Sequence, residues 1–360
     1  MVDVLGLDIG GANTKASFLK TRNGIVKELR TAMEYFPVWK IERGKLSIVL
    51  EKLKKRLVGP TSLDGIGLTM TAELSDAYLT KREGVNHILD CTTDVFNDVP
   101  VFVLSVKAKL LPVGDARKNP LDVASANWAA TGWLVSQTVE NCLIIDVGST
   151  TTSIIPVIEG KNVAEGRSDL EKLGNGELIY SGSLRTNVAT IIDDIFFQEG
   201  KVRLSSEFFA QSGDIHLLLG NIREEEYTVE TCDGRGKTKR EAMARLARVV
   251  CADIEMLTEQ QVMAMAQYVY ARQLEQIAGG LKQVYERIKV QLGQEKISII
   301  VTGLGRNFLA RKAAEKVGFS EIIDLGERLG ADVAVVLPSV SVALMEASNL
   351  EGKPVKWKLL

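Results

Sequence analysis

The feature that most constrains this sequence is a strand–turn–strand pattern that occurs twice. Near the start, an apolar run ends at Asp8 and turns through Gly10 and Gly11 into a second strand. Far along the chain, another apolar run ends at Asp146 and turns through Gly148 in the same way. A repeat of this kind indicates two related halves of one architecture. We therefore expect each half to present a carboxylate and a glycine turn to one cleft.

The first turn carries residue types that suit a phosphate group and its cation. Glycine has no Cβ, so the backbone can turn tightly and direct its amides at an anion. Asp8 suits a hard cation carried on phosphate, and Lys15 adds a positive charge for phosphate oxygens. Taken alone, the pattern also fits a plain glycine hairpin. The candidate phosphate-binding residues of this turn are Gly10, Gly11, Asn13 and Thr14.

Two further glycine turns follow the same logic. The second is rich in hydroxyl groups and lies between two apolar strands. The third follows an apolar strand over 297–302 and precedes a predicted helix over 307–317, where backbone amides can receive an anion or a nucleoside. The candidate ligand-binding residues of these two turns are Gly148, Ser149, Thr150, Thr151, Gly303, Gly305 and Arg306.

Two carboxylates follow the buried strand that is predicted over 64–70. Glu73 and Asp76 lie just after the carboxyl end of this strand, where ligands collect in open α/β sheets. Both are therefore candidates for a general base or for a residue that orients the substrate. A solvated loop would carry the same two residues equally well.

Polar loops in the second half supply the remaining candidates. Arg185 and Thr186 follow the second turn, and arginine is suited to bidentate recognition of phosphate. A structural ion pair of Arg185 with Asp169 or Glu171 explains this arginine equally well. Three further candidates for contact with a substrate are Asp214, Asp233 and Arg235.

Apolar periodicity and small residues predict several helices. The small-residue stretch 121–135 is expected to cross between the halves, and 338–347 is expected to close the fold. A long helix is predicted over 258–292, with Gly279 and Gly280 as a candidate break. Two shorter helices are predicted over 46–57 and 239–251.

Composition narrows the classes of function. The chain has 360 residues, which suits two domains, and a formal net charge of −2, which gives no support to binding of nucleic acid or a membrane surface. No apolar run reaches the ~20 residues that span a bilayer, and the first residues enter a strand rather than a signal peptide. Four scattered cysteines and two histidines do not favour a zinc cluster. We expect a cytoplasmic protein that acts on small molecules.

The three glycine turns, with the predicted crossing helix before the second, resemble those of the acetate and sugar kinase, heat-shock ATPase and actin superfamily. This resemblance implies an α/β fold of two ribonuclease-H-like (actin-like ATPase) domains that face each other across a central cleft. The first domain would span 1–136 and be completed by a C-terminal helix over 338–360. The second would span 137–337, with a helical insertion at about 200–290.

Within that superfamily, the sequence is similar to the hydantoinase/oxoprolinase-like proteins, and more narrowly to the synthases of methanofuran biosynthesis. The segments that carry this similarity are TMTAELSD, ANWAATGW, IIDVGSTTTSIIP, GRSDLEKLGNGELIYSGSLRTNV and DGRGKTKREA. In that family, the phenol of γ-glutamyltyramine displaces diphosphate from an aminomethylfuran-methyl diphosphate and forms an aryl ether. The resemblance therefore implies a Mg²⁺-dependent transferase with these two substrates.

The reaction implied by the resemblance gives the candidate residues separate roles. Asp8 and Asp146 would hold Mg²⁺, while Lys15, Arg185 and the turn amides would neutralise the diphosphate. A carboxylate after the strand over 64–70 would accept the proton of the phenol.

Two other kinds of function stay open. An ATP-dependent kinase or amidohydrolase would use Gly303 and Gly305 for the adenosine of ATP or ADP. A non-catalytic actin-like protein would bind a nucleotide without turnover. The sequence also leaves the oligomeric state open, including a homo-oligomer.

Overall fold

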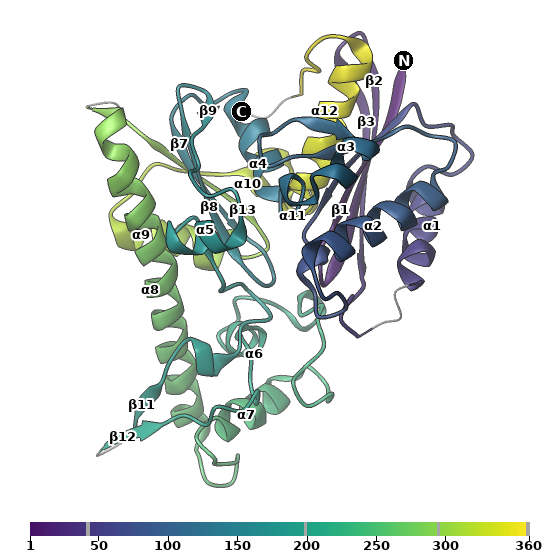
Figure 1. Cartoon of the computed structure of the whole chain (residues 1–360). Helices are drawn as coiled ribbons and strands as arrows, with labels where there is room; N and C mark the ends of the chain where they lie inside the picture. Colours follow the sequence, from purple (N-terminus) through teal and green to yellow (C-terminus); the bar gives the residue numbers. More distant parts are fainter. Residues whose placement is uncertain (41–43, 198–199, 294–295, 358–360) are drawn as a thin grey trace. The chain divides into compact units, whose positions relative to one another are not determined.

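The chain folds into two compact units. The computed structural model describes residues 1–40, 44–197, 200–293 and 296–357. Unit 1 consists of Met1–Cys142, Ile155–Lys172 and Leu325–Leu360, and unit 2 consists of Leu143–Ile154 and Leu173–Asp324. Each unit contains a β-sheet with helices packed against it (Figure 1). The chain first enters unit 2 at Leu143 and returns to unit 1 over Ile155–Lys172.

The first sheet has six strands in the order β3-β2-β1-β4-β5-β6. Strands β1, β2 and β3 are antiparallel neighbours, as the predicted hairpins require, whereas β4 and β5 continue the sheet in parallel. Side chains on both faces of β1 and β4 are buried, which is the pattern of central strands. The bounds are β1 (Val2–Ile9), β2 (Asn13–Arg22), β3 (Ile25–Tyr35), β4 (Gly65–Met70), β5 (Val101–Leu104) and β6 (Leu110–Pro112).

The helices of unit 1 bury apolar faces. Helix α1 buries four leucines at the spacing of an amphipathic helix: Leu46, Leu50, Leu53 and Leu57. Helix α2 was not predicted, although Thr80 caps it by accepting a hydrogen bond from the Glu83 amide. The bounds are α1 (Lys45–Leu57), α2 (Lys81–Val95), α3 (Val113–Lys118), α4 (Asn127–Ser136), α5 (Asp169–Gly174), α10 (Leu325–Leu329), α11 (Ala331–Val335) and α12 (Leu337–Glu351).

Helix α12 lies very close to the backbone of the first sheet. A Cβ at Gly6 would lie 1.9 Å from the carbonyl oxygen of Ser339, and a Cβ at Gly67 would lie 2.3 Å from that of Val342. The two glycines are therefore required by packing, because any side chain would push the helix away. The predicted closing helix over 338–347 is confirmed as the central part of α12.

The second sheet has the order β10-β8-β7-β13-β14, with β9 also paired to β8. A short turn joins β7 to β8, so this hairpin repeats the one that β1 and β2 form. In each sheet, the first strand of the hairpin (β1 or β7) also neighbours a later strand (β4 or β13). That later strand pairs in parallel with a further strand (β5 or β14). The predicted α/β class with two ribonuclease-H-like units is confirmed. The bounds are β7 (Cys142–Val147), β8 (Thr152–Ile158), β9 (Lys161–Asn162), β10 (Leu178–Ile179), β13 (Ser298–Gly303) and β14 (Ile322–Asp324).

In the described residues between β10 and β13, unit 2 carries a small two-stranded sheet and three α-helices. Helix α8 is continuous and reaches from α6 and α7 to β10 (Figure 1). The predicted break at Gly279 and Gly280 is wrong, because Gly280 instead allows close packing: a Cβ there would lie 2.6 Å from Cδ1 of Ile179. The bounds are β11 (Asp194–Phe197), β12 (Gly200–Arg203), α6 (Ser212–Leu218), α7 (Lys239–Arg248), α8 (Glu259–Leu292) and, after β13, α9 (Arg311–Val317).

The helix predicted over 121–135 is wrong in its first part. Helix α4 begins only at Asn127, after a short 3-10 turn. Ser125 interrupts the helical backbone with a φ of 51°, in the left-handed region that residues other than glycine seldom adopt. The small residues of α4 do permit close packing, since a Cβ at Gly132 would lie 2.6 Å from Nδ2 of Asn162.

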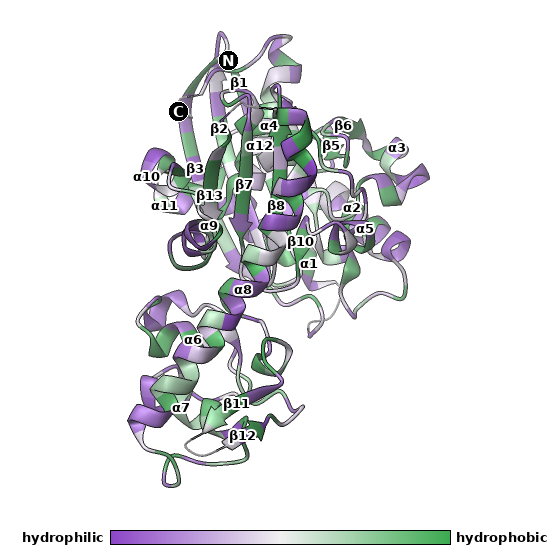
Figure 2. Cartoon of the chain, turned by 90° about the vertical axis from the view of Figure 1, so that its left-hand side faces the viewer, coloured by the Kyte–Doolittle hydropathy of each residue, from purple (hydrophilic) through white to green (hydrophobic). Residues whose placement is uncertain are grey.

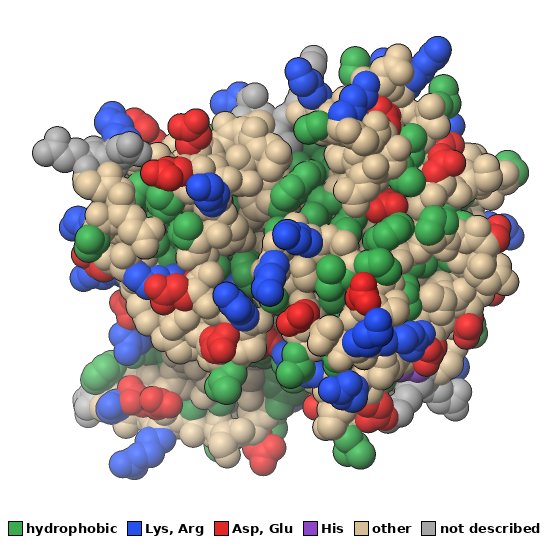
Figure 3. All heavy atoms as spheres, turned by 45° about the horizontal axis from the view of Figure 1, so that its top comes forward, with side chains coloured by type: hydrophobic (Ala, Val, Ile, Leu, Met, Phe, Trp, Pro, Cys, Tyr) green, Lys and Arg blue, Asp and Glu red, His purple; other side chains and the backbone are tan. Residues whose placement is uncertain are grey.

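Hydropathy follows this architecture. The strands of both sheets are mainly hydrophobic (Figure 2), as their burial requires. Charged side chains of both signs are interspersed on the face drawn in Figure 3, in keeping with the small net charge. None of the helices in the described ranges combines the length and the apolar character that crossing a bilayer demands.

The close approach of α12 leads to a prediction about stability. Gly67→Ala should lower the melting temperature by several degrees, because overpacking costs about 1–3 kcal/mol. Gly114→Ala is the matched control, since a Cβ there meets no atom within 4 Å, and it should leave the melting temperature unchanged or raise it. Thermal unfolding followed by circular dichroism measures both. Equal melting temperatures would contradict the packing described for α12.

A second prediction concerns Glu346, which α12 buries against the first sheet. Burial raises the pKa of Glu346 from 4.5 to about 7, and its Oε1 receives no hydrogen bond from any described residue. The folded state therefore holds this proton more tightly than the unfolded state, and stability falls as pH rises from 4.5 through 7. Glu346→Gln should unfold at a higher temperature than the wild type at pH 8.5. The gain is at most about 3 kcal/mol before solvent screening reduces it.

The same measurement at pH 4.5 provides the control. At that pH the wild-type carboxyl is neutral in the folded state and about half ionised in the unfolded state, so its effect on stability changes by only about 0.4 kcal/mol from the low-pH limit and the two proteins should unfold at similar temperatures. A Glu346→Gln variant that gained no stability at high pH relative to low pH would show that the carboxyl is not held neutral.

Candidate functional site

The first glycine hairpin brings Asp8 and Lys15 together in unit 1. The register of β1 and β2 places Lys15 directly opposite Asp8, and Thr69 of β4 is its neighbour on the other side. Opposed side chains share a face of the sheet, and Lys15 Nζ lies 3.4 Å from Asp8 Oδ2. Burial raises the pKa of Asp8, and the positive charge of Lys15 opposes that rise. Asp8 Oδ1 is buried and receives no hydrogen bond within the described part of the chain.

The turn of this hairpin is closed by one backbone hydrogen bond. The Gly10 amide donates to the Asn13 carbonyl oxygen at 3.0 Å, and a Cβ at Gly10 would lie 2.8 Å from the same oxygen. A Cβ at Gly11 would meet no atom within 4 Å. Thr14 is fully buried opposite Ile9. The tip of the turn is thus open, while its base requires glycine.

The second hairpin has the same closure in unit 2. The Gly148 amide donates to the Thr151 carbonyl oxygen at 2.9 Å. The loop that follows β10 lies on this turn, since the Leu184 and Arg185 amides both donate to the Ser149 carbonyl oxygen at 2.9 Å. The structure therefore brings the predicted Arg185 to the second turn.

Further contacts fix the same loop. Arg185 also donates from Nη1 to Thr150 Oγ1 at 3.1 Å, so its side chain lies along the turn. Thr186 is buried, and its hydroxyl oxygen accepts a hydrogen bond from the Gly182 amide at 2.8 Å. Gly182 packs on the turn itself, because a Cβ there would lie 2.5 Å from the Thr150 carbonyl carbon.

The third glycine turn lies at the end of β7, beside Asp146. Gly303 has a φ of 86°, and a Cβ there would lie 2.6 Å from Asp146 Oδ1. The Gly305 amide donates to the Val147 carbonyl oxygen at 3.0 Å. Unit 2 therefore gathers Asp146, the second turn and the third turn at one end of its sheet.

Arg306 lies next to this turn but forms an ion pair. Its Nε lies 3.1 Å from Asp324 Oδ1 at the end of β14, and its Nη1 donates to the Gly303 carbonyl oxygen at 3.3 Å. The predicted helix over 307–317 begins as a π-helical turn at Arg306–Ala310 and continues as α9. The arginine thus ties the third turn to the neighbouring strand.

A chain of side-chain hydrogen bonds from α6 and α8 reaches the loop that packs on the second turn. His216 of α6 lies between Asn221 and Gln273, with its two ring nitrogens each 3.1 Å from a side-chain amide atom. Gln273 of α8 in turn donates to Ser181 Oγ at 3.1 Å and to the Gly182 carbonyl oxygen at 2.9 Å. Burial lowers the pKa of His216 to about 3, so the ring is neutral.

Glu73 lies in a separate polar cluster of unit 1. It is buried directly after β4, and Ser125 Oγ lies 2.7 Å from Glu73 Oε1 and 2.7 Å from Asp169 Oδ2. Lys81 Nζ lies 2.7 Å from Asp169 Oδ2. Burial raises the pKa of Glu73. Asp76, the other predicted carboxylate, is exposed.

Sequence reasoning missed three members of this cluster as functional residues: Lys81, Ser125 and Asp169. They come from three distant segments, and Asp169 had been considered only as an ion-pair partner for Arg185. The Thr80-x-x-Glu83 pattern could have revealed the start of α2, and with it the position of Lys81. No local pattern marks Ser125.

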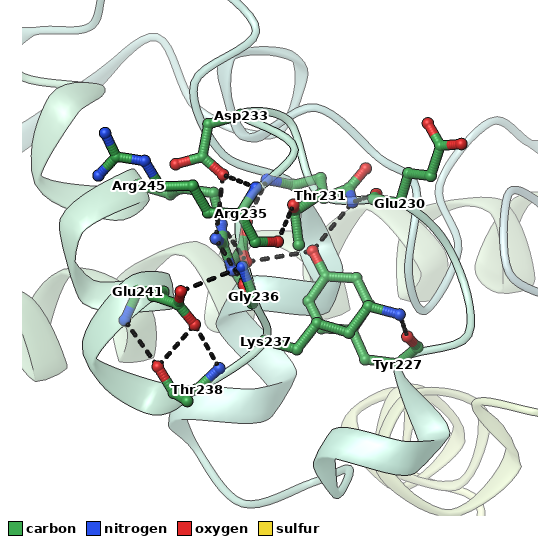
Figure 4. A network of polar contacts seen from close by, with 12 residues as sticks. Tyr227, Glu230, Thr231, Asp233, Arg235, Gly236, Lys237, Thr238, Glu241 and Arg245 are labelled. Carbon is green, nitrogen blue, oxygen red and sulfur yellow. Dashed lines mark hydrogen bonds and ion pairs between the residues drawn. The ribbon is translucent and has the colours of Figure 1, made fainter.

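The remaining substrate candidates lie in or beside a network of polar contacts in unit 2, and Figure 4 shows two of them, Asp233 and Arg235, with Arg245. Asp214 is fully buried and accepts from Nε of Arg245 at 2.8 Å. Asp233 also pairs with Arg245, at 3.2 Å from its Nη1, and with Arg248 at 3.0 Å. Of the three candidates, Arg235 is the one with an exposed side chain. Their contact with a substrate stays a prediction.

Comparison with known proteins places this chain in a family. The sequence model of the hydantoinase/oxoprolinase family matches residues 64–343. A relative from Methanocaldococcus jannaschii is 37% identical over 97% of this chain and 98% of its own length. A second relative, from Methanococcus vannielii, is 36% identical over 61% of this chain and 97% of its own length. Both bear the name (4-{4-[2-(gamma-L-glutamylamino)ethyl]phenoxymethyl}furan-2-yl)methanamine synthase.

The solved structures that align with most of this chain have a much lower sequence identity to it. An ethanolamine utilization protein from Carboxydothermus hydrogenoformans aligns with a TM-score of 0.43 and 12% identity, over 95% of this chain and 89% of its own. An inorganic polyphosphate/ATP-glucomannokinase from Arthrobacter aligns with a TM-score of 0.43 and 13% identity, over 96% and 99%. The family assignment rests on the sequence matches: the chain belongs to the hydantoinase/oxoprolinase family, in the group of enzymes that includes these two synthases.

Proposed function

We propose that this chain is a cytoplasmic transferase that forms the aryl ether of a methanofuran-type cofactor. Its substrates would be γ-glutamyltyramine, which supplies a phenol, and an aminomethylfuran-methyl diphosphate. The observation that carries the proposal is the 37% identity, over 97% of the chain, to a relative named as a synthase of a phenoxymethyl-furan. That name describes an ether between a phenol ring and a furan methylene group.

The proposed reaction makes two demands on the protein. The phenol oxygen bonds to the methylene carbon, the bond from that carbon to the diphosphate oxygen breaks, and the phenol loses its proton. The furan ring can spread the positive charge that develops on the methylene carbon. The protein must therefore accept a proton at one side of the reacting carbon and stabilise a polyanion at the other.

Glu73 is the residue that we propose accepts the phenol proton. A phenol with a pKa near 10 is only about 0.1% ionised at pH 7, so forming the phenolate costs roughly 4 kcal/mol. Glu73 is buried with a raised pKa, and its Oε2 receives no hydrogen bond from the described residues. These properties support proton transfer at Glu73, whereas the exposure of Asp76 favours a solvated carboxylate.

The glycine turns, Lys15 and Arg185 are proposed to bind the diphosphate. Backbone amides in the two turns can donate to phosphate oxygens without adding a titratable group. Lys15 supplies a point charge, and the planar guanidinium of Arg185 suits two phosphate oxygens at once. The open space around Gly11 supports access of a ligand to the first turn.

Asp8 and Asp146 are the residues that we propose for Mg²⁺. The buried Asp8 Oδ1, which lacks a hydrogen-bond donor among the described residues, fits an oxygen that meets a cation. In the described ranges, no three His, Cys, Asp or Glu side chains come together as metal ligands. Diphosphate oxygens and water would therefore complete the coordination, as is usual for Mg²⁺. When bound, the cation would neutralise charge on the leaving group.

An ATP-dependent reaction is the second candidate. The packing of Gly303 and Gly305 at the strand end beside Asp146 supports it, because the aminomethylfuran has no adenosine to place there. ATP or ADP would then be consumed or would bind as an additional ligand. The two candidates differ in whether diphosphate from the furan substrate or phosphate from ATP is released.

The requirement for ATP separates the two candidates. We expect the purified protein to form the ether and release diphosphate from the two substrates with Mg²⁺ alone. Product and diphosphate are measured by mass spectrometry and a coupled phosphate assay. Ether formation that depended on ATP and produced ADP in equal amount would contradict the proposed transferase.

Asp8 offers a test of the cation site. Asp8→Asn keeps the size of the side chain but removes its charge, so the Mg²⁺ concentration for half-maximal activity should rise and kcat/KM should fall about 100-fold or more. The exposed Asp98→Asn is the matched control and should leave both unchanged. An Asp8→Asn enzyme with the wild-type Mg²⁺ dependence would remove Asp8 from the site.

A further inference from the structure

The cluster around Glu73 contains a hydroxyl group that contacts two carboxyl groups at once. Ser125 Oγ lies 2.7 Å from Glu73 Oε1 and 2.7 Å from Asp169 Oδ2. Lys81 Nζ lies 3.3 Å from the same hydroxyl oxygen. All four residues belong to unit 1, and three separate segments of the chain join Glu73 in this cluster.

Counting protons fixes the direction of these hydrogen bonds. A serine hydroxyl has one proton, so it can donate to only one of the two carboxyl groups. Both contacts are hydrogen bonds only if one carboxyl is protonated and donates to Ser125, which donates to the other. Lys81 Nζ lies 2.7 Å from Asp169 Oδ2 but 4.0 Å from Glu73 Oε1, which assigns the negative charge to Asp169 and the proton to Glu73.

Burial supports the same assignment. The Glu73 side chain is fully buried, whereas the Asp169 side chain is 20% exposed. An ionised carboxylate is costly where water is excluded, and this cost raises the pKa of Glu73. The protonated Oε1 of Glu73 leaves Oε2 as an acceptor, and no described residue donates to it.

The backbone of Ser125 is held in a strained conformation. Its φ of 51° lies in the left-handed region, which costs a residue with a Cβ about 1–2 kcal/mol. Such strain persists where the surrounding structure enforces it, and it is frequent at functional sites. Here it places the hydroxyl between the two carboxyl groups, just before α4 begins at Asn127.

We propose that Ser125 is the centre of a proton relay from Glu73 to Asp169 that removes the proton of the phenol. This inference rests on the proposed function. The phenol proton moves to Glu73 Oε2 as the proton on Oε1 moves to Ser125 Oγ, and the original hydroxyl proton of Ser125 moves to Asp169 Oδ2. One negative charge leaves Asp169 and appears on the phenolate, so Glu73 is neutral before and after the transfer.

This relay explains how a fully buried carboxyl group can serve as the acceptor. No charge has to develop on Glu73, because the charge changes on Asp169, which is partly exposed and can release its proton to water. Lys81 forms an ion pair with Asp169 at 2.7 Å. In this scheme Glu73 touches the phenol, while Ser125, Asp169 and Lys81 are positioning residues that act through it.

The test compares two phenols that differ in acidity. Ser125→Ala should lower kcat for γ-glutamyltyramine about 100-fold, because general acid–base transfer contributes at least that much. With a ring-fluorinated γ-glutamyltyramine whose phenol is already ionised at pH 8, the same variant should stay within about threefold of the wild type. Ser136→Ala, whose hydroxyl donates to the Trp133 carbonyl oxygen, is the matched control and should affect neither substrate.

The outcomes are distinguishable. Equal losses of Ser125→Ala on both phenols would overturn the relay and leave a structural role, while the proposed function would stand. A wild-type enzyme that formed no ether from either phenol would overturn the proposed function, and the relay with it. A Ser125→Gly variant, which relieves the backbone strain but also lacks the hydroxyl, replaces Ser125→Ala if the latter does not fold.

A measurement without substrate tests the resting protonation. Infrared difference spectra of the wild type and Glu73→Gln at pH 7 should show the carbonyl band of a protonated carboxylic acid that is absent from the variant. If the spectra show only an ionised carboxylate lost on substitution, Glu73 does not carry the proton, and the relay is overturned.

Discussion

A single amide-to-carbonyl hydrogen bond closes the first and the second glycine turn, and the positions of the candidate residues on both hairpins depend on it. By returning the chain through a tight turn, the bond between Gly10 and Asn13 sets the register that puts Lys15 opposite Asp8. The bond between Gly148 and Thr151 does the same for the second hairpin. The loop after β10 and the third glycine turn both bind to the second hairpin, at the carbonyl oxygens of Ser149 and Val147.

The two carboxyl groups proposed for reaction chemistry in unit 1 are both buried, which raises the pKa of each, but their neighbours differ. Asp8 is buried beside a lysine on the neighbouring strand, and the positive charge of this lysine opposes the rise in pKa that burial causes. Glu73 is buried beside a serine, and the nearest lysine is closer to another carboxylate. A lysine thus lies nearer to Asp8, at 3.4 Å, than to Glu73, at 4.0 Å, and this difference fits the separate roles that we propose for the two carboxyl groups.

Local patterns in the sequence were enough to predict the hairpins and the class of the fold. Alternation of apolar strands with glycine turns is a short-range signal, and it located the turns after Asp8 and Asp146 correctly. The interruption at Ser125 could not be predicted, because a left-handed serine is enforced by contacts with residues far away in the sequence. The continuity of α8 through Gly280 has the same origin, since Ile179 packs against the glycine.

The neutral histidine behind the second turn has a consequence for how this enzyme responds to acidity. With a pKa of about 3, His216 keeps one tautomer from mildly acid to alkaline solution, so Gln273 always finds the same partner. The hydrogen bonds from Gln273 to Ser181 and Gly182 are therefore not altered by protonation of His216 in this pH range. His216 therefore adds no titration of its own to the pH dependence of turnover near neutral pH.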